Sequence, residues 1–271
     1  MKKLNGLMAV ALTGFACSAA QAAAVVEWGY TVETTWVASS FGAGTGTIID
    51  HTDGAGLELS WGANVPLALG VERSGLVISD SPVDSATGGL FTNNLVPSPT
   101  ATITHTNNSI SSSFATLNTA TLLTTLTLFE VDPDPAPDPG VLPLPPLSFA
   151  INFIETLNST PCGFPSGSVC DDIFVIDNAA FDNAFTYKGI TYYVSIVTPT
   201  GVIDPLPAAS CLAAGAAVGC YGFQTRENAI TPVSFGIVIT TDPLLVSEPG
   251  ALALAGLGLL GLGLVRRRKA V

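Results

Sequence analysis

The stretch Trp28-Gly-Tyr-Thr-Val-Glu-Thr-Thr-Trp36 has large or β-branched side chains at every second position, with two tryptophans at its ends. Successive side chains of a β-strand point to opposite faces, so this spacing predicts a strand with one buried face. Aromatic and β-branched residues also favour a strand over a helix. This run therefore indicates an all-β body.

Similar runs follow along the chain and are separated by turn residues. We expect strands at 45–49, 57–61, 76–78, 101–105, 121–131, 147–154, 173–176, 181–187, 190–197, 221–225 and 233–240. Turns are expected at 51–54 and 72–75, and Lys188-Gly189 fits a two-residue hairpin. Outside the two ends, no stretch has a helical stripe of useful length. The sequence predicts a single β-sandwich or jelly-roll-like domain.

Two stretches break the strand pattern. Asp132-Pro-Asp-Pro-Ala-Pro-Asp-Pro-Gly140 is too rich in proline for a ladder or helix and predicts an extended connection between the sheets. Its Asp132, Asp134 and Asp138 could attract Ca²⁺, but prolines keep the chain straight where a calcium loop must wrap around its ion. A solvated crossover loop is the favoured interpretation. The Ala/Gly-rich stretch 208–219 is expected to be a surface loop.

The last 26 residues have a different composition. A short motif, Val246-Ser247-Glu248-Pro249, precedes an uncharged apolar run at 250–265 and the basic cluster Arg266, Arg267, Arg268 and Lys269. Sixteen helical residues rise about 24 Å, which is marginal for a membrane span. The run has no polar stripe, as a core helix of a soluble domain would have. A membrane helix with its cations on the cytoplasmic side is expected.

This order resembles the PEP-CTERM sorting tail of Gram-negative bacteria, with Ser247 in place of the usual first proline. The resemblance implies recognition by an exosortase, a membrane transpeptidase that removes the tail in or near the motif. It also implies transient contact with the inner membrane, rather than a permanent anchor.

The N-terminal end fits a secretory signal peptide. Lys2 and Lys3 form a positive region, 7–16 is apolar, and Ala20-Gln21-Ala22 is a small-residue cleavage site. The expected organisation is a signal peptide at 1–22, a secreted body at 23–245 and a sorting tail at 246–271. The protein is expected to cross the inner membrane through the Sec pathway.

The body is strongly acidic once both ends are set aside. Arg73, Lys188 and Arg226 stand against 20 acidic residues between 23 and 247, a net charge of −17. Phosphate contacts need Lys and Arg, so this balance excludes nucleic acid as a partner.

Four cysteines remain in the body, as two local pairs. Seven residues separate Cys162 from Cys170, and eight separate Cys211 from Cys220. In an oxidising compartment we expect the disulfides 162–170 and 211–220, although four cysteines allow three connectivities. A zinc site is disfavoured, because there is no C-x₂-C pair and the chain has only two histidines.

Thr104-His105-Thr106-Asn107 resembles the motif of the THxN family of PEP-CTERM proteins, which is akin to the choice-of-anchor surface domains. Trp61-Gly62, Ser74-Gly75-Leu76, 185–192 and Arg226-Glu227-Asn228 are similar too. The resemblance implies no enzymatic activity, ligand or cofactor.

The candidate site residues have structural and chemical interpretations. His105 and Asn107 lie on one face of a strand and could hydrogen-bond to a neighbouring loop, which makes Thr104, His105 and Asn107 a structural motif. Catalysis by His105 lacks a companion nucleophile motif. Asp171-Asp172 would point to opposite faces, so a turn or weak Ca²⁺ site is favoured over a catalytic pair.

These observations predict an exported, non-enzymatic structural or adhesive protein of the cell surface or exopolysaccharide matrix, without cofactor or catalytic residues. The alternative is a carbohydrate-binding module or weak glycan hydrolase. Exposed aromatic rings would favour glycan binding, although Trp28, Trp36 and Trp61 fit a core better. Carboxylates clustered with His105 in a cleft would favour hydrolysis.

Overall fold

The computed structural model describes residues 23–52, 54–132, 142–143, 147–156, 158, 160–176, 182–198 and 204–244. Strands dominate these residues, and their one helix, α1 (Ala208–Ala213), has six residues. The prediction of an all-β body is therefore confirmed. The expected signal peptide and sorting tail lie outside the described residues, so their boundaries stay predictions. No helix in the described ranges is long and apolar enough to cross a membrane.

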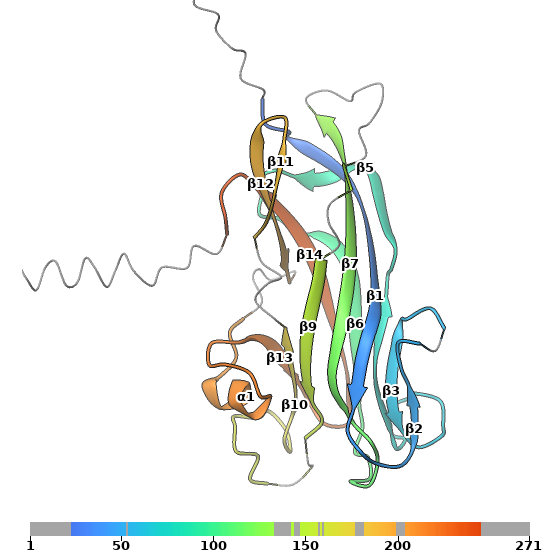
Figure 1. Cartoon of the computed structure of the whole chain (residues 1–271). Helices are drawn as coiled ribbons and strands as arrows, with labels where there is room; N and C mark the ends of the chain where they lie inside the picture. Colours follow the sequence, from blue (N-terminus) through green and yellow to red (C-terminus); the bar gives the residue numbers. More distant parts are fainter. Residues whose placement is uncertain are drawn as a thin grey trace, which may run out of the picture.

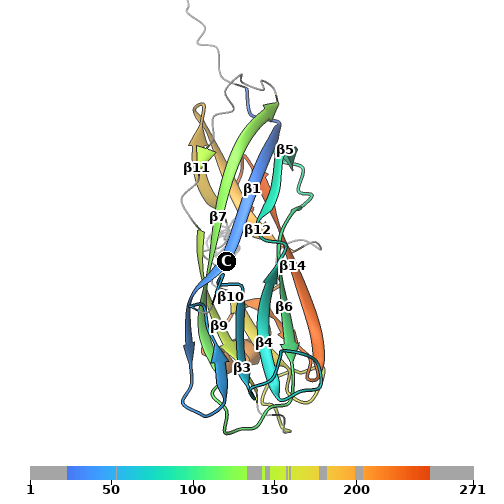
Figure 2. The ribbon, with the colours of Figure 1, turned by 90° about the vertical axis from the view of Figure 1, so that its right-hand side faces the viewer.

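The strands form two curled antiparallel sheets that lie as two layers (Figures 1 and 2). The first sheet has the order β13 (Tyr221–Thr225), β10 (Asp172–Ile176), β9 (Leu147–Ile154), β7 (Leu117–Asp132), β1 (Glu27–Phe41) and β5 (Val83–Phe91), with β8 (Leu142–Pro143) also paired to β7. The second sheet has the order β11 (Asn183–Tyr187), β12 (Ile190–Val197), β14 (Ala229–Thr240), β6 (Ser98–Asn107), β4 (Arg73–Ser79), β3 (Glu58–Gly62) and β2 (Thr47–Ile49).

The facing sides of the sheets share one large core. The alternating residues of β1 are buried as expected, and Trp28, Trp36 and Trp61 are each at most 2% exposed. Rings from opposite sheets meet edge to face, with centroids 5.2 Å apart for Trp28 and Tyr192 and 5.3 Å apart for Trp61 and Phe153. The three tryptophans therefore belong to the core and are not exposed platforms for sugar stacking.

The expected turn at 72–75 is wrong, because β4 begins at Arg73. Its side chain is buried, and the guanidinium donates hydrogen bonds to backbone oxygens of Thr47 and Ala63 and to Ser60 Oγ. Gly75 lies flat against β3, where an added Cβ would come within 2.9 Å of the Leu59 carbonyl oxygen. Contacts with neighbouring strands thus give this segment the conformation of a buried strand, although its residues are typical of a turn.

Three other features differ from expectation. β5 was not expected, because Gly88 and Gly89 interrupt its pattern; both have positive φ, beside an irregular register with β1. The stretch 208–219 contains α1, whose Cys211 is buried. The proline-rich segment joins β7 and β9, which are neighbours in one sheet, so a crossover between sheets is wrong. Its residues 133–141 and 144–146, with Asp134 and Asp138, lie outside the described residues.

Both expected disulfides are confirmed. Cys162 pairs with Cys170 across a Cα–Cα distance of 5.1 Å, and Cys211 pairs with Cys220 across 5.8 Å. The first closes the loop between β9 and β10, and the second ties α1 to the start of β13. Both therefore hold surface segments at the same end of the first sheet (Figure 1).

Each disulfide should stabilise the folded chain by about 2–3 kcal/mol, because both close short loops of nearly equal length. Changing Cys162 and Cys170 together to Ala should lower the free energy of unfolding by that amount, and the pair Cys211 and Cys220 should lose at least as much. Urea unfolding of the two double variants measures both losses. Peptide mapping without reduction that found a 162–211 or 170–220 bridge would contradict this pairing.

Candidate functional site

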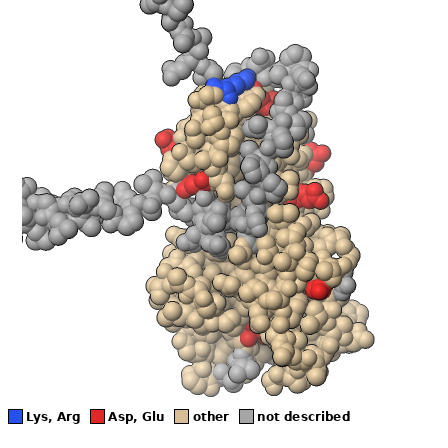
Figure 3. Space-filling model, viewed as in Figure 1, with Lys and Arg blue, Asp and Glu red and all other residues tan. Residues whose placement is uncertain are grey.

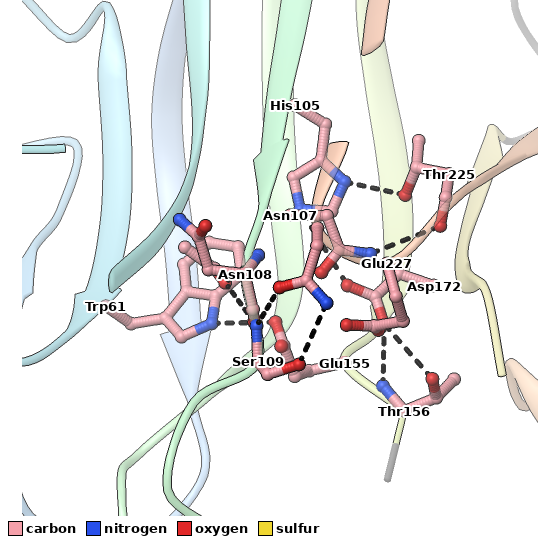
Figure 4. Close-up of polar contacts among 12 residues, drawn as sticks. Trp61, His105, Asn107, Asn108, Ser109, Glu155, Thr156, Asp172, Thr225 and Glu227 are labelled. Atoms are coloured by element: carbon pink, nitrogen blue, oxygen red, sulfur yellow. Dashed lines mark hydrogen bonds and ion pairs between the residues drawn. The ribbon is translucent and has the colours of Figure 1, made fainter. Parts of the chain in front are cut away.

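Thr104, His105, Thr106 and Asn107 are the last four residues of β6. His105 and Asn107 are 1% and 0% exposed and point across the core toward the first sheet (Figure 4). Both contact Thr225, the last residue of β13. The two side chains thus share a face, as their spacing predicted, but their partner is a strand of the facing sheet and not an adjacent loop.

His105 makes polar contacts with two strands of the first sheet. Its Nδ1 lies 2.7 Å from Thr225 Oγ1, and its Nε2 lies 3.8 Å from Asp172 Oδ2 at the start of β10. The ring lies near Trp61 and Phe153, with centroid distances of 6.4 and 5.3 Å. Burial lowers the pKa of His105 to about 3, so the imidazole is neutral at neutral pH. A neutral ring with one well-formed hydrogen bond is typical of a structural residue.

Two asparagines extend this contact. Asn107 Nδ2 donates to the Thr225 backbone oxygen at 3.2 Å, while Asn107 Oδ1 has no hydrogen-bond partner. Asn108 is equally buried, and its Nδ2 donates to backbone oxygens of Ala68 and Arg73. Its Oδ1 accepts from the Gly70 amide at 2.8 Å. Asn108 therefore fixes the loop between β3 and β4 beside the motif.

Three acidic residues, here called the acid cluster, lie around His105 and Asn107 (Figure 4). Glu155 directly follows β9 and accepts a hydrogen bond of 2.9 Å from Trp61 Nε1 of the second sheet. Asp172 begins β10, and its Oδ1 accepts from the Thr156 amide at 2.8 Å. Glu227 lies in the turn between β13 and β14. Folding thus brings together carboxyl groups that are far apart in the sequence.

Asp172 is fully buried, whereas Glu155 and Glu227 are partly exposed at the edge of the core. Burial raises the pKa of Glu155 to about 8, and the charge of Glu227 adds to this rise. Burial raises the pKa of Glu227 to about 7, although Asn107, Asn158 and Ser109 lie beside it and oppose the rise. Burial also raises the pKa of Asp172 well above its usual range, followed by the charge of Glu155. Within the described residues, no three His, Cys, Asp or Glu side chains are arranged to hold a metal ion.

The Asp171-Asp172 pair is divided as expected for neighbours on a strand. Asp172 faces the acid cluster, whereas Asp171 accepts hydrogen bonds from the Gly167 amide at 2.7 Å and from Ser168 Oγ. Asp171 therefore holds the loop of the first disulfide. The two carboxylates therefore have different partners and point to different surroundings.

Only the edge of this region borders a surface depression. His105 and Asp172 are at most 1% exposed. Glu155 lines a depression that is mainly polar, together with Ala43, Ile110, Ser111, Ser112, Phe114, Thr116, Thr156 and Asn158. We call this the polar depression. His51, the other histidine, lies in the loop after β2, with Nδ1 3.0 Å from Ser39 Oγ.

Sequence reasoning missed several residues of this site. Glu155 carried one weak signal, as an acidic residue directly after an apolar strand. Thr156, Thr225 and Asn108 carried none, because Thr and Asn are common at strand ends and turns. The one sequence signal for Glu227 is its place in the tripeptide Arg226-Glu227-Asn228, which carries part of the family resemblance.

His105→Ala should lower the free energy of unfolding by roughly 2–4 kcal/mol, because it removes a buried hydrogen bond and leaves a cavity. The contact uses Nδ1, whose position an Asn side chain can reproduce, so His105→Asn should recover more stability than His105→Gln. His51→Ala is the matched control and should cost less than about 1 kcal/mol. Urea unfolding of these four variants measures the changes in stability. A His105→Ala chain of unchanged stability that lost surface attachment would contradict the structural role.

Comparison with known proteins identifies the C-terminal end. Residues 245–269 match the PEP-CTERM protein-sorting motif. No match to the chain was found among curated proteins. The relation of Thr104–Asn107 to the THxN and choice-of-anchor families is not confirmed and stays a prediction. The chain carries a PEP-CTERM sorting motif, which is recognised by exosortase and implies secretion and sorting to the cell surface.

Proposed function

We propose that this protein is a non-enzymatic structural or adhesive component of the cell surface or exopolysaccharide matrix. An exosortase removes its C-terminal run after transient passage through the inner membrane. The body is a β-sandwich module that needs no cofactor. The single observation that supports location at the cell surface is the sorting motif at 245–269.

The burial of His105, Asp172 and the three tryptophans supports a structural role, whereas Glu155 lies at the polar depression. His105 and Asp172 lie between the sheets, and Trp28, Trp36 and Trp61 lie in the core. A hydrolase needs an acid or base within hydrogen-bond reach of its substrate. In the described part of the chain, the polar groups near His105 instead link strands of the two sheets.

The distribution of charged side chains supports an extracellular location and disfavours nucleic acid as a partner. On the face drawn in Figure 3, acidic side chains are scattered and the basic ones lie only at the tip of the β11–β12 hairpin. There Lys188 Nζ lies 2.7 Å from Glu130 Oε2. Scattered negative charge keeps a secreted protein soluble and disfavours binding to polyanions.

The polar depression favours a second candidate, binding of a neutral glycan. Its Ser111, Ser112, Thr116, Thr156 and Asn158 offer hydroxyl and amide groups, and Phe114 offers an apolar surface beside them. Such a lining suits sugar hydroxyl groups. This candidate concerns a ligand of the same surface protein and leaves its sorting unchanged.

Changing both Glu248 and Pro249 to Ala should block processing and leave the protein in the inner membrane with its C-terminal run attached. Ser247→Pro restores the usual residue of the motif and should be processed at least as well as the natural chain. Mass spectrometry of the C-terminal peptide in membrane and surface fractions measures both. An intact C-terminus on natural protein at the cell surface would contradict removal.

Cells that lack the protein should attach less well to surfaces or retain less matrix. A chain with Glu155→Gln should restore the phenotype as fully as the natural chain, because Glu155 has no chemical role in this proposal. An adhesion assay with both complementing chains tests this. Complementation by the natural chain alone, with equal amounts of both chains at the surface, would favour glycan hydrolysis or binding.

A further inference from the structure

The acid cluster joins the two sheets at one end of the body. Glu155, Asp172 and Glu227 come from the first sheet and its turn into β14, and they meet Trp61 of β3 and His105 and Asn107 of β6. Several of their oxygens lack a hydrogen bond of normal geometry: Asp172 Oδ2, Glu155 Oε1 and both oxygens of Glu227, although Asn107, Asn158 and Ser109 lie close enough to Glu227 to lower its pKa. Asn107 Oδ1 and His105 Nε2 also lack one. Five of these six atoms are oxygen acceptors, and the neutral His105 ring can supply one N–H, so acceptors outnumber donors in the cluster.

Within the described residues, no ion pair connects a basic side chain to the acid cluster, and the contact with His105 involves a neutral ring. Arg73 is hydrogen-bonded among β2, β3 and β4, and Lys188 pairs with Glu130. Arg226 is exposed, and its Nε and Asp171 Oδ2 flank the same face of Gly167. Asp171 adds negative charge near Glu227 and does not neutralise it.

Buried carboxylates without cations are costly and take up protons instead. A protonated carboxyl group is also a donor, so each proton can supply a hydrogen bond to a neighbouring carboxylate or to Asn107 Oδ1. Protons therefore remove both the excess charge and the excess of acceptors. The side chains are not arranged to hold a metal ion in their place.

We propose that the acid cluster is a proton-operated latch: shared protons bind Glu155, Asp172 and Glu227 to one another and to Asn107, and their loss loosens this end of the two-sheet body. The strands affected are β9 and β10, because Glu155 follows the end of β9 and Asp172 begins β10. Thr156 Oγ1 donates to the Cys170 backbone oxygen, and Cys162–Cys170 closes the loop, so Glu155 and Asp172 are joined to one unit.

The direction of the pH effect follows from the raised pKa values. Glu155 and Glu227 hold protons up to about pH 8 and 7 in the folded chain. An unfolded Glu loses its proton near pH 4.3. The folded chain therefore binds more protons, so stability is highest in weak acid and is lost as the pH rises through 7 and 8. His105 has the opposite effect below pH 6.5: it is buried in its neutral form, so stability falls as the pH drops and the unfolded histidine takes up a proton.

The test is urea unfolding of the full chain between pH 6 and 8, in a non-ionic detergent that keeps the apolar C-terminal run dissolved. As the pH rises from 6 to 8, deprotonation of the two glutamates favours unfolding, while His105 opposes it about four-fold. The net result should be an increase of the unfolding constant on the order of a hundred-fold. A double variant, Glu155→Gln and Asp172→Asn, mimics the protonated state and should show a rise below about ten-fold. Glu33→Gln, at an exposed position of β1, should keep the natural dependence.

Infrared spectroscopy of the natural chain provides a second measurement that needs no variant to fold. Absorption from buried protonated carboxyl groups should be present at pH 6 and decline toward pH 8.5. A constant or rising stability from pH 6 to 8, or no protonated carboxyl band at pH 6, would overturn the proposal. Saturable stabilisation of the natural chain at pH 8 by CaCl₂, absent in the double variant, would show a cation site instead and would also overturn it.

Discussion

The ladder between β1 and β7 is the contact on which the rest of the structure depends. It runs from Glu27 opposite Asp132 to Phe41 opposite Leu117 and forms the centre of the first sheet. β5 pairs with the outer edge of β1, and β9 pairs with β7. Because the ladder fixes which residues of β1 face inward, it also places Trp28 and Trp36 in the shared core. The second sheet packs on the surface that this ladder creates.

Polar contacts between the sheets then fix their alignment at both ends. At one end, Trp61 bonds to Glu155, and His105 and Asn107 bond to Thr225. At the other, Tyr187 donates to Glu130 Oε2 at 2.8 Å, from β11 to β7. An apolar core is tolerant of small sliding, whereas a buried polar group left without a partner is costly. The polar contacts therefore select one relative position of the two sheets.

The structure and the sorting motif fit the same setting. Two disulfides brace surface loops, as suits a secreted chain in an oxidising compartment. Arg73 is buried and hydrogen-bonded to Ser60, whereas Lys188 pairs with Glu130 through a side chain that is 41% exposed. Both basic side chains thus contribute polar contacts to the fold. The sorting motif directs the protein to the cell surface, and the body is the folded unit that is sorted there.

The sequence by itself determined the features that depend on local pattern. Alternation from Trp28 to Trp36 specifies a half-buried strand, proximity pairs Cys162 with Cys170 and Cys211 with Cys220, and the composition of the last residues specifies a sorting tail. Only the tertiary structure decided that Arg73 begins a buried strand, since its partners lie on β2 and β3 and in the loop after β3. It alone united His105, Glu155, Asp172 and Glu227. Their burial and their unusual pKa values arise from sheet packing between distant segments, which no short stretch of sequence records.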